Sequence, residues 1–149
     1  MKLLRETIRK LILESNSDSA ANFFDALQSE FDYLRENKYG TSIFETTFPD
    51  DCRVEFGIAI TENQEVHIDY IETIGDDCFQ KGYASRVMKH ILFLLDSFNL
   101  SAVLEVESFG SGGMDDNDLS QWYKSMGFKH EKDFYQQMGF AGLRRYPSP

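Results

Sequence analysis

Two stretches of alternating apolar and polar residues, Cys52–Thr61 and Glu65–Ile74, stand almost next to each other in the sequence. A period of two places alternate side chains on one face of a β-strand. The polar segment Glu62-Asn63-Gln64 between them predicts a hairpin turn. The chain is therefore expected to fold around an antiparallel strand pair with one buried face. In the first stretch, that face consists of Val54, Phe56, Ile58 and Ile60.

Helical and extended patterns flank this hairpin on both sides. We predict helices where apolar residues recur at three- and four-residue spacing, and strands where short apolar runs end in turn residues. The predicted helices are Ser19–Asn37, Gly82–Asn99 and Asp118–Met126, and the further strands are Thr41–Phe48, Ser101–Glu107 and one or two within Phe128–Tyr146. This order predicts an α/β (mixed α+β) sheet, with an antiparallel meander, then a right-handed parallel β-α-β crossover, and helices on both faces.

The composition is that of one globular domain, and it narrows the classes of function. The chain has 149 residues, of which 42% are hydrophobic, and no apolar run long enough to span a membrane. Its net charge of −10 would repel nucleic acid and attract cationic molecules, although the acidity also serves solubility alone. The two cysteines, Cys52 and Cys78, show neither a disulfide framework nor metal-ligand spacing. We therefore expect no metal and a reducing, cytoplasmic setting.

The strand at Glu65–Ile74 has two distinct faces. Strict alternation groups Val66, Ile68, Tyr70, Glu72 and Ile74 on one face. The other face then carries His67, Asp69, Ile71 and Thr73. We expect His67 and Asp69 to be structural, unless a bulge reverses the register.

A phosphate-binding pattern follows this strand. Between Ile71 and Leu95 a strand ends, a short loop turns, and a helix begins at Gly82. The first amides of a helix have no intrahelical partner and carry the positive end of its dipole, so they hold phosphate without cationic side chains. Gly82 allows the main chain to approach the anion closely, and Ala84 keeps the first turn small.

The segment Phe79-Gln-Lys-Gly82-Tyr-Ala84 resembles the pyrophosphate loop of the GNAT family of acyl-CoA N-acyltransferases, which reads Arg/Gln-x-x-Gly-x-Gly/Ala. Here Phe79 takes the position of the Arg or Gln, and Gln80 comes one place later. The resemblance covers about Thr41 to Phe128 and implies that main-chain amides grip the diphosphate of acetyl-CoA. The implied coenzyme A-binding residues are Ile74, Phe79, Gln80, Lys81, Gly82, Tyr83, Ala84, Ser85 and Asn117.

A second match lies downstream in the order that the family has. Tyr123-Lys-Ser-Met-Gly127-Phe128 resembles the family's Tyr-x-x-x-Gly-Phe helix end, and Val103-Leu-Glu-Val106 its preceding strand. The resemblance implies that Tyr123 protonates the departing thiolate as general acid. The alternative is that Tyr123 packs on the sheet beside Trp122 and that Gly127 is a helix C-cap.

The resemblance implies a reaction but no particular acceptor. In the family, an amine attacks the thioester directly in a ternary complex, near the splayed strand end where Glu72, Thr73 and Ile74 lie here. Glu72 is our candidate general base, and its alternative role is a solvent-exposed carboxylate. The acceptor is a small-molecule or protein amine, and a homodimer is an open alternative. A non-catalytic GNAT-like binding protein or a virion-packaged structural protein is the other reading. An unrelated nucleotide-binding α/β protein has less support, because the glycine loop follows several strands.

The N-terminal segment, residues 1–15, lies outside the GNAT-like domain, residues 16–149. It has an apolar face that includes Leu4, Ile8 and Leu11. Its charges argue against a secretory signal. An ordinary amphipathic helix is one interpretation. The other is a resemblance to the cleaved leaders of tailed-phage proteins, with Ile12-Leu13-Glu14 as the cleavage tripeptide, which would place the enzyme in host cytoplasm or virion.

Overall fold

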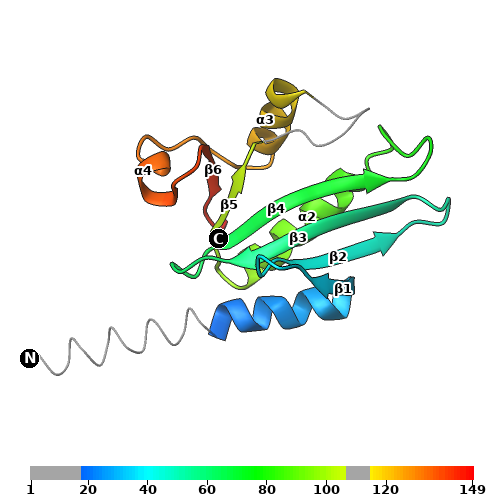
Figure 1. Ribbon diagram of the computed structural model, residues 1–149, viewed down its shortest axis with the longest axis horizontal. Helices are drawn as coiled ribbons and strands as arrows, with labels where there is room; N and C mark the ends of the chain where they lie inside the picture. Colours follow the sequence, from blue (N-terminus) through cyan, green and yellow to red (C-terminus); the bar gives the residue numbers. More distant parts are fainter. Residues whose placement is uncertain (1–17, 107–114) are drawn as a thin grey trace, which may run out of the picture.

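The computed structural model describes residues 18–106 and 115–149, which form a six-stranded mixed sheet with helices (Figure 1). Neighbouring strands are antiparallel except β4 and β5, which are parallel and joined through α2 (Tyr83–Ser97). The predicted mixed sheet is confirmed, and the handedness of the crossover stays a prediction. In space, as in sequence, the strands run β1 (Asp32–Glu36), β2 (Ser42–Thr47), β3 (Arg53–Ile60), β4 (Val66–Ile74), β5 (Ala102–Glu105) and β6 (Gly142–Arg145).

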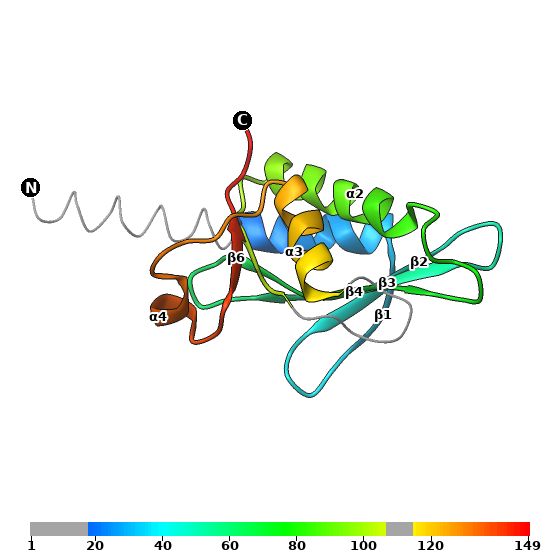
Figure 2. The same cartoon turned by 90° about the horizontal axis from the view of Figure 1, so that it is seen from above.

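Two helices cover the same face of the sheet and share its core. Figure 2 shows α2 and the helix at residues 18–30 side by side above the strands. Phe56 of β3 has no exposed surface, stacks on Phe44 with ring centroids 5.4 Å apart, and meets Phe31 edge-on at 4.9 Å. The core residues nearest to these rings come from both helices and the central strands: Phe23, Leu27, Val54, Ile58, Ile68, Met88, Ile91 and Leu95.

Helices lie on both faces of the sheet, as predicted, but the long ones share one face. The helix α3 (Asp116–Ser125) adds Tyr123 to the same core as α2. The opposite face has the five-residue helix α4 (Phe134–Met138), whose Gln137 hydrogen-bonds to Arg144 of β6. The terminal stretch was predicted as one or two strands, and it contains the strand β6 and an isolated bridge from Lys129 to Arg144. The helix α4 between them was not predicted.

The helix predicted for Ser19–Asn37 is too long. It ends at residue 30, and β1 then pairs with β2 through an irregularity between Tyr33 and Arg35. Leu34 continues the helical spacing of Phe24, Leu27 and Phe31, but all five residues of β1 are exposed. Main-chain pairing with the neighbouring strand therefore outweighs the helical pattern, which no side-chain burial supports here.

A bulge in β4 corrects the predicted assignment of its faces. The register shifts where Gly57 pairs with Tyr70 and Ile58 pairs with Ile68, so Asp69 is the extra residue. Beyond the bulge, Ile71 packs against the core, and the Tyr70 hydroxyl donates to Glu55 on the opposite face at 2.6 Å. Tyr70 and Glu72 therefore lie on the face away from Ile68, because an extra residue reverses the alternation.

Consecutive arginines of β6 bind carboxylates on opposite sides of the sheet. Arg144 forms an ion pair with Glu65 at 2.9 Å, and Arg145 with Asp96 of α2 at 2.8 Å. Both guanidinium groups are largely buried. Removing Asp96 would leave the charge of Arg145 without an ion-pair partner among the described residues, whereas Arg144 also pairs with Glu131 at 3.3 Å. The strand thereby attaches the end of α2 to one face and the β3–β4 turn to the other.

Residues 1–17, which include the predicted leader and its cleavage tripeptide, lie outside the described residues. Over the part of the chain that is described, no helix has the length and apolar character needed to cross a membrane.

Replacing Phe56 with Ala tests the shared core. The substitution should lower the free energy of unfolding by about 3–5 kcal/mol, because it leaves a cavity between the rings of Phe31 and Phe44. Urea denaturation followed by circular dichroism measures this change. The matched control is Phe93→Ala on α2, whose side chain is 66% exposed, with an expected change within about 0.5 kcal/mol. Equal losses in both variants would contradict this core assignment.

Candidate functional site

The loop between β4 and α2 ends in an uncapped helix N-terminus. Gly82 precedes the helix with φ of 77°, and no side chain caps the first turn, which contains no acidic residue. Among the described residues, no hydrogen bond is donated by the amides of Tyr83, Ala84 or Ser85. By contrast, α3 is capped by Asp115, whose carboxylate accepts from the Asp118 amide at 2.8 Å. The start of α2 thus keeps unpartnered amides and a positive dipole end.

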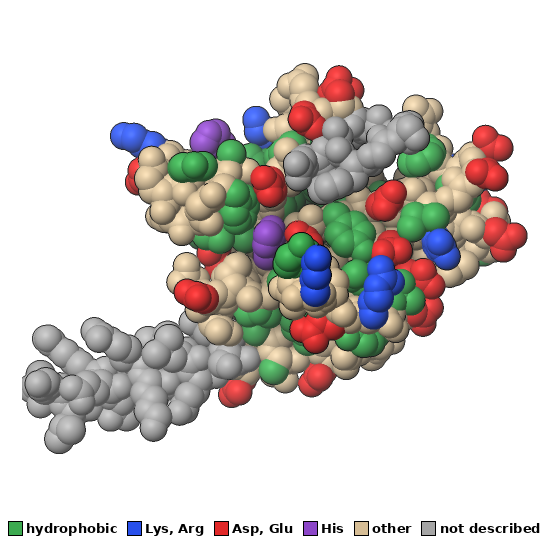
Figure 3. All heavy atoms as spheres, viewed as in Figure 1, with side chains coloured by type: hydrophobic (Ala, Val, Ile, Leu, Met, Phe, Trp, Pro, Cys, Tyr) green, Lys and Arg blue, Asp and Glu red, His purple; other side chains and the backbone are tan. Residues whose placement is uncertain are grey.

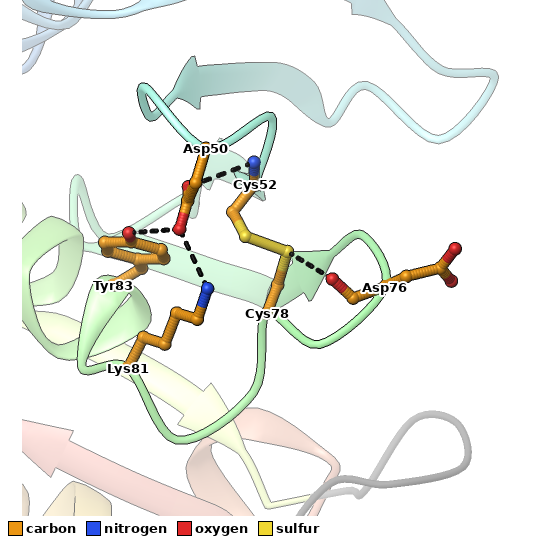
Figure 4. Close-up of a disulfide and its surroundings, with 6 residues drawn as sticks. All are labelled: Asp50, Cys52, Asp76, Cys78, Lys81 and Tyr83. Carbon is orange, nitrogen blue, oxygen red and sulfur yellow. Dashed lines mark hydrogen bonds and ion pairs between the residues drawn. A yellow bond between two sulfur atoms is a disulfide. The ribbon is translucent and has the colours of Figure 1, made fainter.

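Asp50, from the turn between β2 and β3, binds the side chains that flank Gly82. Its Oδ2 accepts from Lys81 Nζ at 2.9 Å and from the Tyr83 hydroxyl at 2.7 Å (Figure 4). The Tyr83 and Lys81 hydrogen bonds lower the pKa of Asp50 to about 2. The same contact raises the pKa of Lys81 and that of Tyr83. The only cation of the loop is therefore partly neutralised from within the chain.

Cys52 and Cys78 form a disulfide, which corrects the expectation that the two cysteines are unpaired. Their Cα atoms are 5.6 Å apart, and both residues are almost fully buried. The bond joins the turn that carries Asp50 to the loop that precedes Gly82 (Figure 4). Sequence reasoning missed it because two cysteines 26 residues apart contain no pairing signal until the hairpin brings their segments together.

The other residues implied as coenzyme A ligands lie around this turn. Phe79 is 43% exposed, and Gln80 has φ of 65°, so both belong to the irregular part of the loop. Ile74 ends β4 opposite Arg53. The Tyr83 ring stacks on the Phe48 ring with centroids 3.9 Å apart, and the Arg86 guanidinium lies over the Phe48 ring. Ala84 and Ser85 occupy the first turn of α2 and are partly buried.

Asn117 is the exception, because it lies in α3 and not in the loop predicted to end there. It is exposed in the first turn of that helix. Within the described ranges, no hydrogen bond or ion pair connects its side chain to the start of α2. Residues 107–114, most of the predicted glycine-rich loop, lie outside the described residues.

The strands β4 and β5 pair only at their beginnings. Their ladder consists of Val66 with Ala102 and His67 with Val103, whereas β4 runs on to Ile74. Figure 1 shows the two ribbons diverging beyond this point. Across residues 18–106 and 115–149, no strand pairs with the β5-facing side of β4 after His67. Main-chain groups on that side of β4 therefore remain for another partner.

A hydrogen bond attaches α3 to the first turn of α2. Trp122 Nε1 donates to Ser85 Oγ at 3.0 Å. The next residue, Tyr123, is 5% exposed, and burial raises its pKa to about 12. Among the described residues, its hydroxyl has no hydrogen-bond partner, and no fully buried side-chain oxygen lacks one. The ring of Tyr123 is therefore in the core, and its hydroxyl bonds to no described residue.

The spacing Tyr-x-x-x-Gly-Phe has a structural explanation here. The Phe128 amide donates to the Tyr123 carbonyl at 3.2 Å, and the Gly127 amide to that of Lys124 at 3.1 Å. Gly127 has φ of 96°, so the segment is a Schellman helix end. The ring of Phe128 meets that of Tyr123 edge-on at 5.9 Å. The motif fixes the ring of Tyr123, and a chemical role would belong to its hydroxyl.

The candidate base Glu72 is exposed on the face opposite the long helices, paired with Glu55 of β3. His67 lies on this same face of the sheet as Glu72, and its ring stacks on that of Phe140 with centroids 5.3 Å apart. Burial lowers the pKa of His67, although Asp69 and Glu105 act in the other direction. In the two described ranges, no group of His, Cys, Asp and Glu side chains is arranged to hold a metal ion.

Asp50 and its contacts were not foreseen from the sequence. The turn Pro49-Asp50-Asp51 indicated only a chain reversal, and its distance from Lys81 in sequence gave no reason to connect them. The hairpin register of β3 and β4 brings the two loops to the same end of the sheet.

No protein-family model matches this sequence, and no curated protein matches it either. Among solved structures, the chain is similar to the crystal structure of the anti-CRISPR protein AcrVA5, with a TM-score of 0.48 and 17% sequence identity. The similarity covers 68% of this chain and 96% of that one.

The pKa of Asp50 tests the contact with Lys81 and Tyr83. In the wild type, the Asp50 carboxylate should titrate at about pH 2, below its ordinary 3.8. The stabilisation from this depressed pKa is present above pH 3.8 and is lost as the pH falls through about 2. Carboxyl carbon NMR should show the midpoint rising toward 3.8 in Tyr83→Phe. Tyr135→Phe, at an exposed site on α4, is the control, and an unmoved midpoint in Tyr83→Phe would refute the contact.

Proposed function

We propose that this protein is an N-acetyltransferase that transfers an acetyl group from acetyl-CoA to an amine. The observation that carries the proposal is the combination of a diverging β4–β5 pair with an uncapped α2 N-terminus at the end of β4. Both features lie where the GNAT-like motifs occur in the sequence. Either feature alone is common, and their coincidence favours an acyl-CoA donor.

In this proposal, the diphosphate of acetyl-CoA binds at the amides of Tyr83, Ala84 and Ser85. These amides lack partners, and a Cβ added at Gly82 would meet nothing within 4 Å, so the turn is open to an anion. Lys81 is a further ligand if it exchanges its contact with Asp50 for phosphate. The pantetheine arm would extend along the unpaired side of β4 toward Ile74, where main-chain groups can bind its amides.

The transfer step needs one proton removed and one delivered. The amine nitrogen bonds to the thioester carbon, the carbon–sulfur bond breaks, and the thiolate leaves. Tyr123 would protonate that thiolate, since its hydroxyl is neutral at pH 7, bonds to no described residue and is carried on a fixed ring. Glu72 remains the proposed acceptor of the amine proton, directly or through water. The amine itself is a small molecule or a protein side chain.

A non-catalytic binding protein is the second candidate, and one observation favours it. The carboxylate of Asp50 already accepts hydrogen bonds from Lys81 and Tyr83, and it adds negative charge beside the proposed diphosphate site. Coulomb repulsion between that carboxylate and a diphosphate would weaken binding. Such a protein would keep the fold and lose turnover.

Isothermal titration with acetyl-CoA tests the donor site. Gly82→Val should weaken binding about tenfold or more, because a β-branched residue strains at φ of 77° and crowds the amides. The matched control is Gly139→Val at the end of α4, which has φ of 80° and similarly open surroundings. It carries the same backbone strain far from the site in sequence and should leave the affinity unchanged. Absence of acetyl-CoA binding at millimolar concentration in the wild type would rule out the proposal.

Turnover separates the enzyme from the binding protein. Detection of free CoA across a panel of amines should find an acceptor, and Tyr123→Phe should then reduce kcat about 10²-fold or more with the acetyl-CoA Kd unchanged. Tyr135→Phe is again the control. A Tyr123→Phe enzyme with full kcat would remove the general-acid role, and wild-type binding without turnover for any amine would favour the second candidate.

A further inference from the structure

The disulfide lies beside the proposed coenzyme A site. The chain contains two cysteines, and the bond uses both of them. Cys52 lies two residues after Asp50, and Cys78 lies four residues before Gly82. The bond therefore joins the turn between β2 and β3 to the loop that presents the α2 amides (Figure 4).

The loop needs such a fixed point because its main chain is held in unfavourable conformations. Asp77 has φ of 57° and Gln80 has φ of 65°, both in the left-handed region that non-glycine residues rarely adopt. Such conformations persist only where the surroundings impose them. Here the bond at Cys78 fixes the chain between these two residues, and the contact of Lys81 with Asp50 holds it directly after Gln80.

The exposure of the neighbours indicates how little else holds the loop. Asp76, Asp77, Phe79 and Gln80 are all exposed, and Cys78 is the buried residue among them, at 2%. The salt bridge from Lys81 to Asp50 is between side chains that are 43% and 35% exposed, and such surface pairs contribute little. Without the disulfide, the loop would depend on this weak contact, on the burial of the Cys78 thiol, and on Tyr83 at its far end, which bonds to Asp50 and stacks on Phe48.

We propose that the Cys52–Cys78 bond is a thiol–disulfide switch that sets the affinity of the α2 N-terminus for coenzyme A; this rests on the proposed function. The reductant is a dithiol. One of its thiolates attacks a sulfur of the bond, the other cysteine leaves as a thiolate, and the second thiol of the reductant resolves the mixed disulfide. Two electrons and two protons pass to the cysteines, and the dithiol becomes a disulfide.

Reduction lowers affinity through loss of preorganisation. In the oxidised chain, Asp77 and Gln80 hold the conformation that aims the amides of α2, so binding orders little more. In the reduced chain, the Cys78 thiol can donate to the Asp76 carbonyl, 3.3 Å away, and the loop can relax without losing that partner. Binding must then order the loop again, which corresponds to a Kd about tenfold higher.

The experiment titrates the full chain with desulfo-CoA, a ligand that has the diphosphate but no thiol to exchange. Calorimetry is run on the oxidised protein and on protein reduced with dithiothreitol, with the redox state checked by thiol counting. The expected result is a Kd about tenfold higher after reduction. Because the chain has two cysteines, the reductant has no other site of action.

The matched control is the double variant Cys52→Ser with Cys78→Ser, which should bind like the reduced wild type and ignore dithiothreitol. Equal affinities of oxidised and reduced wild type would overturn the switch and leave the proposed function standing. Absence of binding in both states would overturn the proposed function and the switch together. Loss of the far-UV circular dichroism signal on reduction would show a staple of the whole fold, which also overturns a local switch.

Discussion

The limited pairing between β4 and β5 is the constraint on which the candidate site depends. Two residue pairs hold these strands together, and β4 then continues along β3 alone. The strands can diverge because the antiparallel ladder of β3 and β4 supports β4 without β5. On the other side, β6 pairs with the whole of β5 and attaches it to α2 through Arg145. Each strand is thus stabilised away from the gap, and main-chain groups remain for a ligand.

The sequence pattern predicted the elements whose burial is local and regular. The alternation in β3 and the helical spacing of α2 are both present where expected, since each apolar face meets the same core. The pattern failed at β1, whose exposed residues are held by main-chain pairing. It failed again at Asp69, because an extra residue in a strand leaves no mark on hydrophobic alternation until its partner strand is known.

The candidate site was predictable in the same uneven way. Gly82 and its helix start are visible in sequence, because a glycine stands directly before the helical spacing of apolar residues in α2. Asp50 and the two bonded cysteines come from segments far apart in sequence, and only the fold brings them together. Tyr123 shows a further limit of sequence prediction. The spacing Tyr-x-x-x-Gly-Phe fits a Schellman helix end as well as it fits a catalytic tyrosine. Its position was predicted, whereas its use depends on what its hydroxyl contacts.

The irregularity between Tyr33 and Arg35 has a consequence for self-association. A flat strand at the border of a sheet offers its main chain to a second copy, and continuous sheets between molecules can then grow. Here β1 is interrupted by this irregularity and carries Asp32, Arg35 and Glu36 on its short length. At the opposite border, β6 is four residues long and has Lys129 bridged to Arg144. Both borders thus disfavour the edge-to-edge pairing that would join the sheet to that of another molecule.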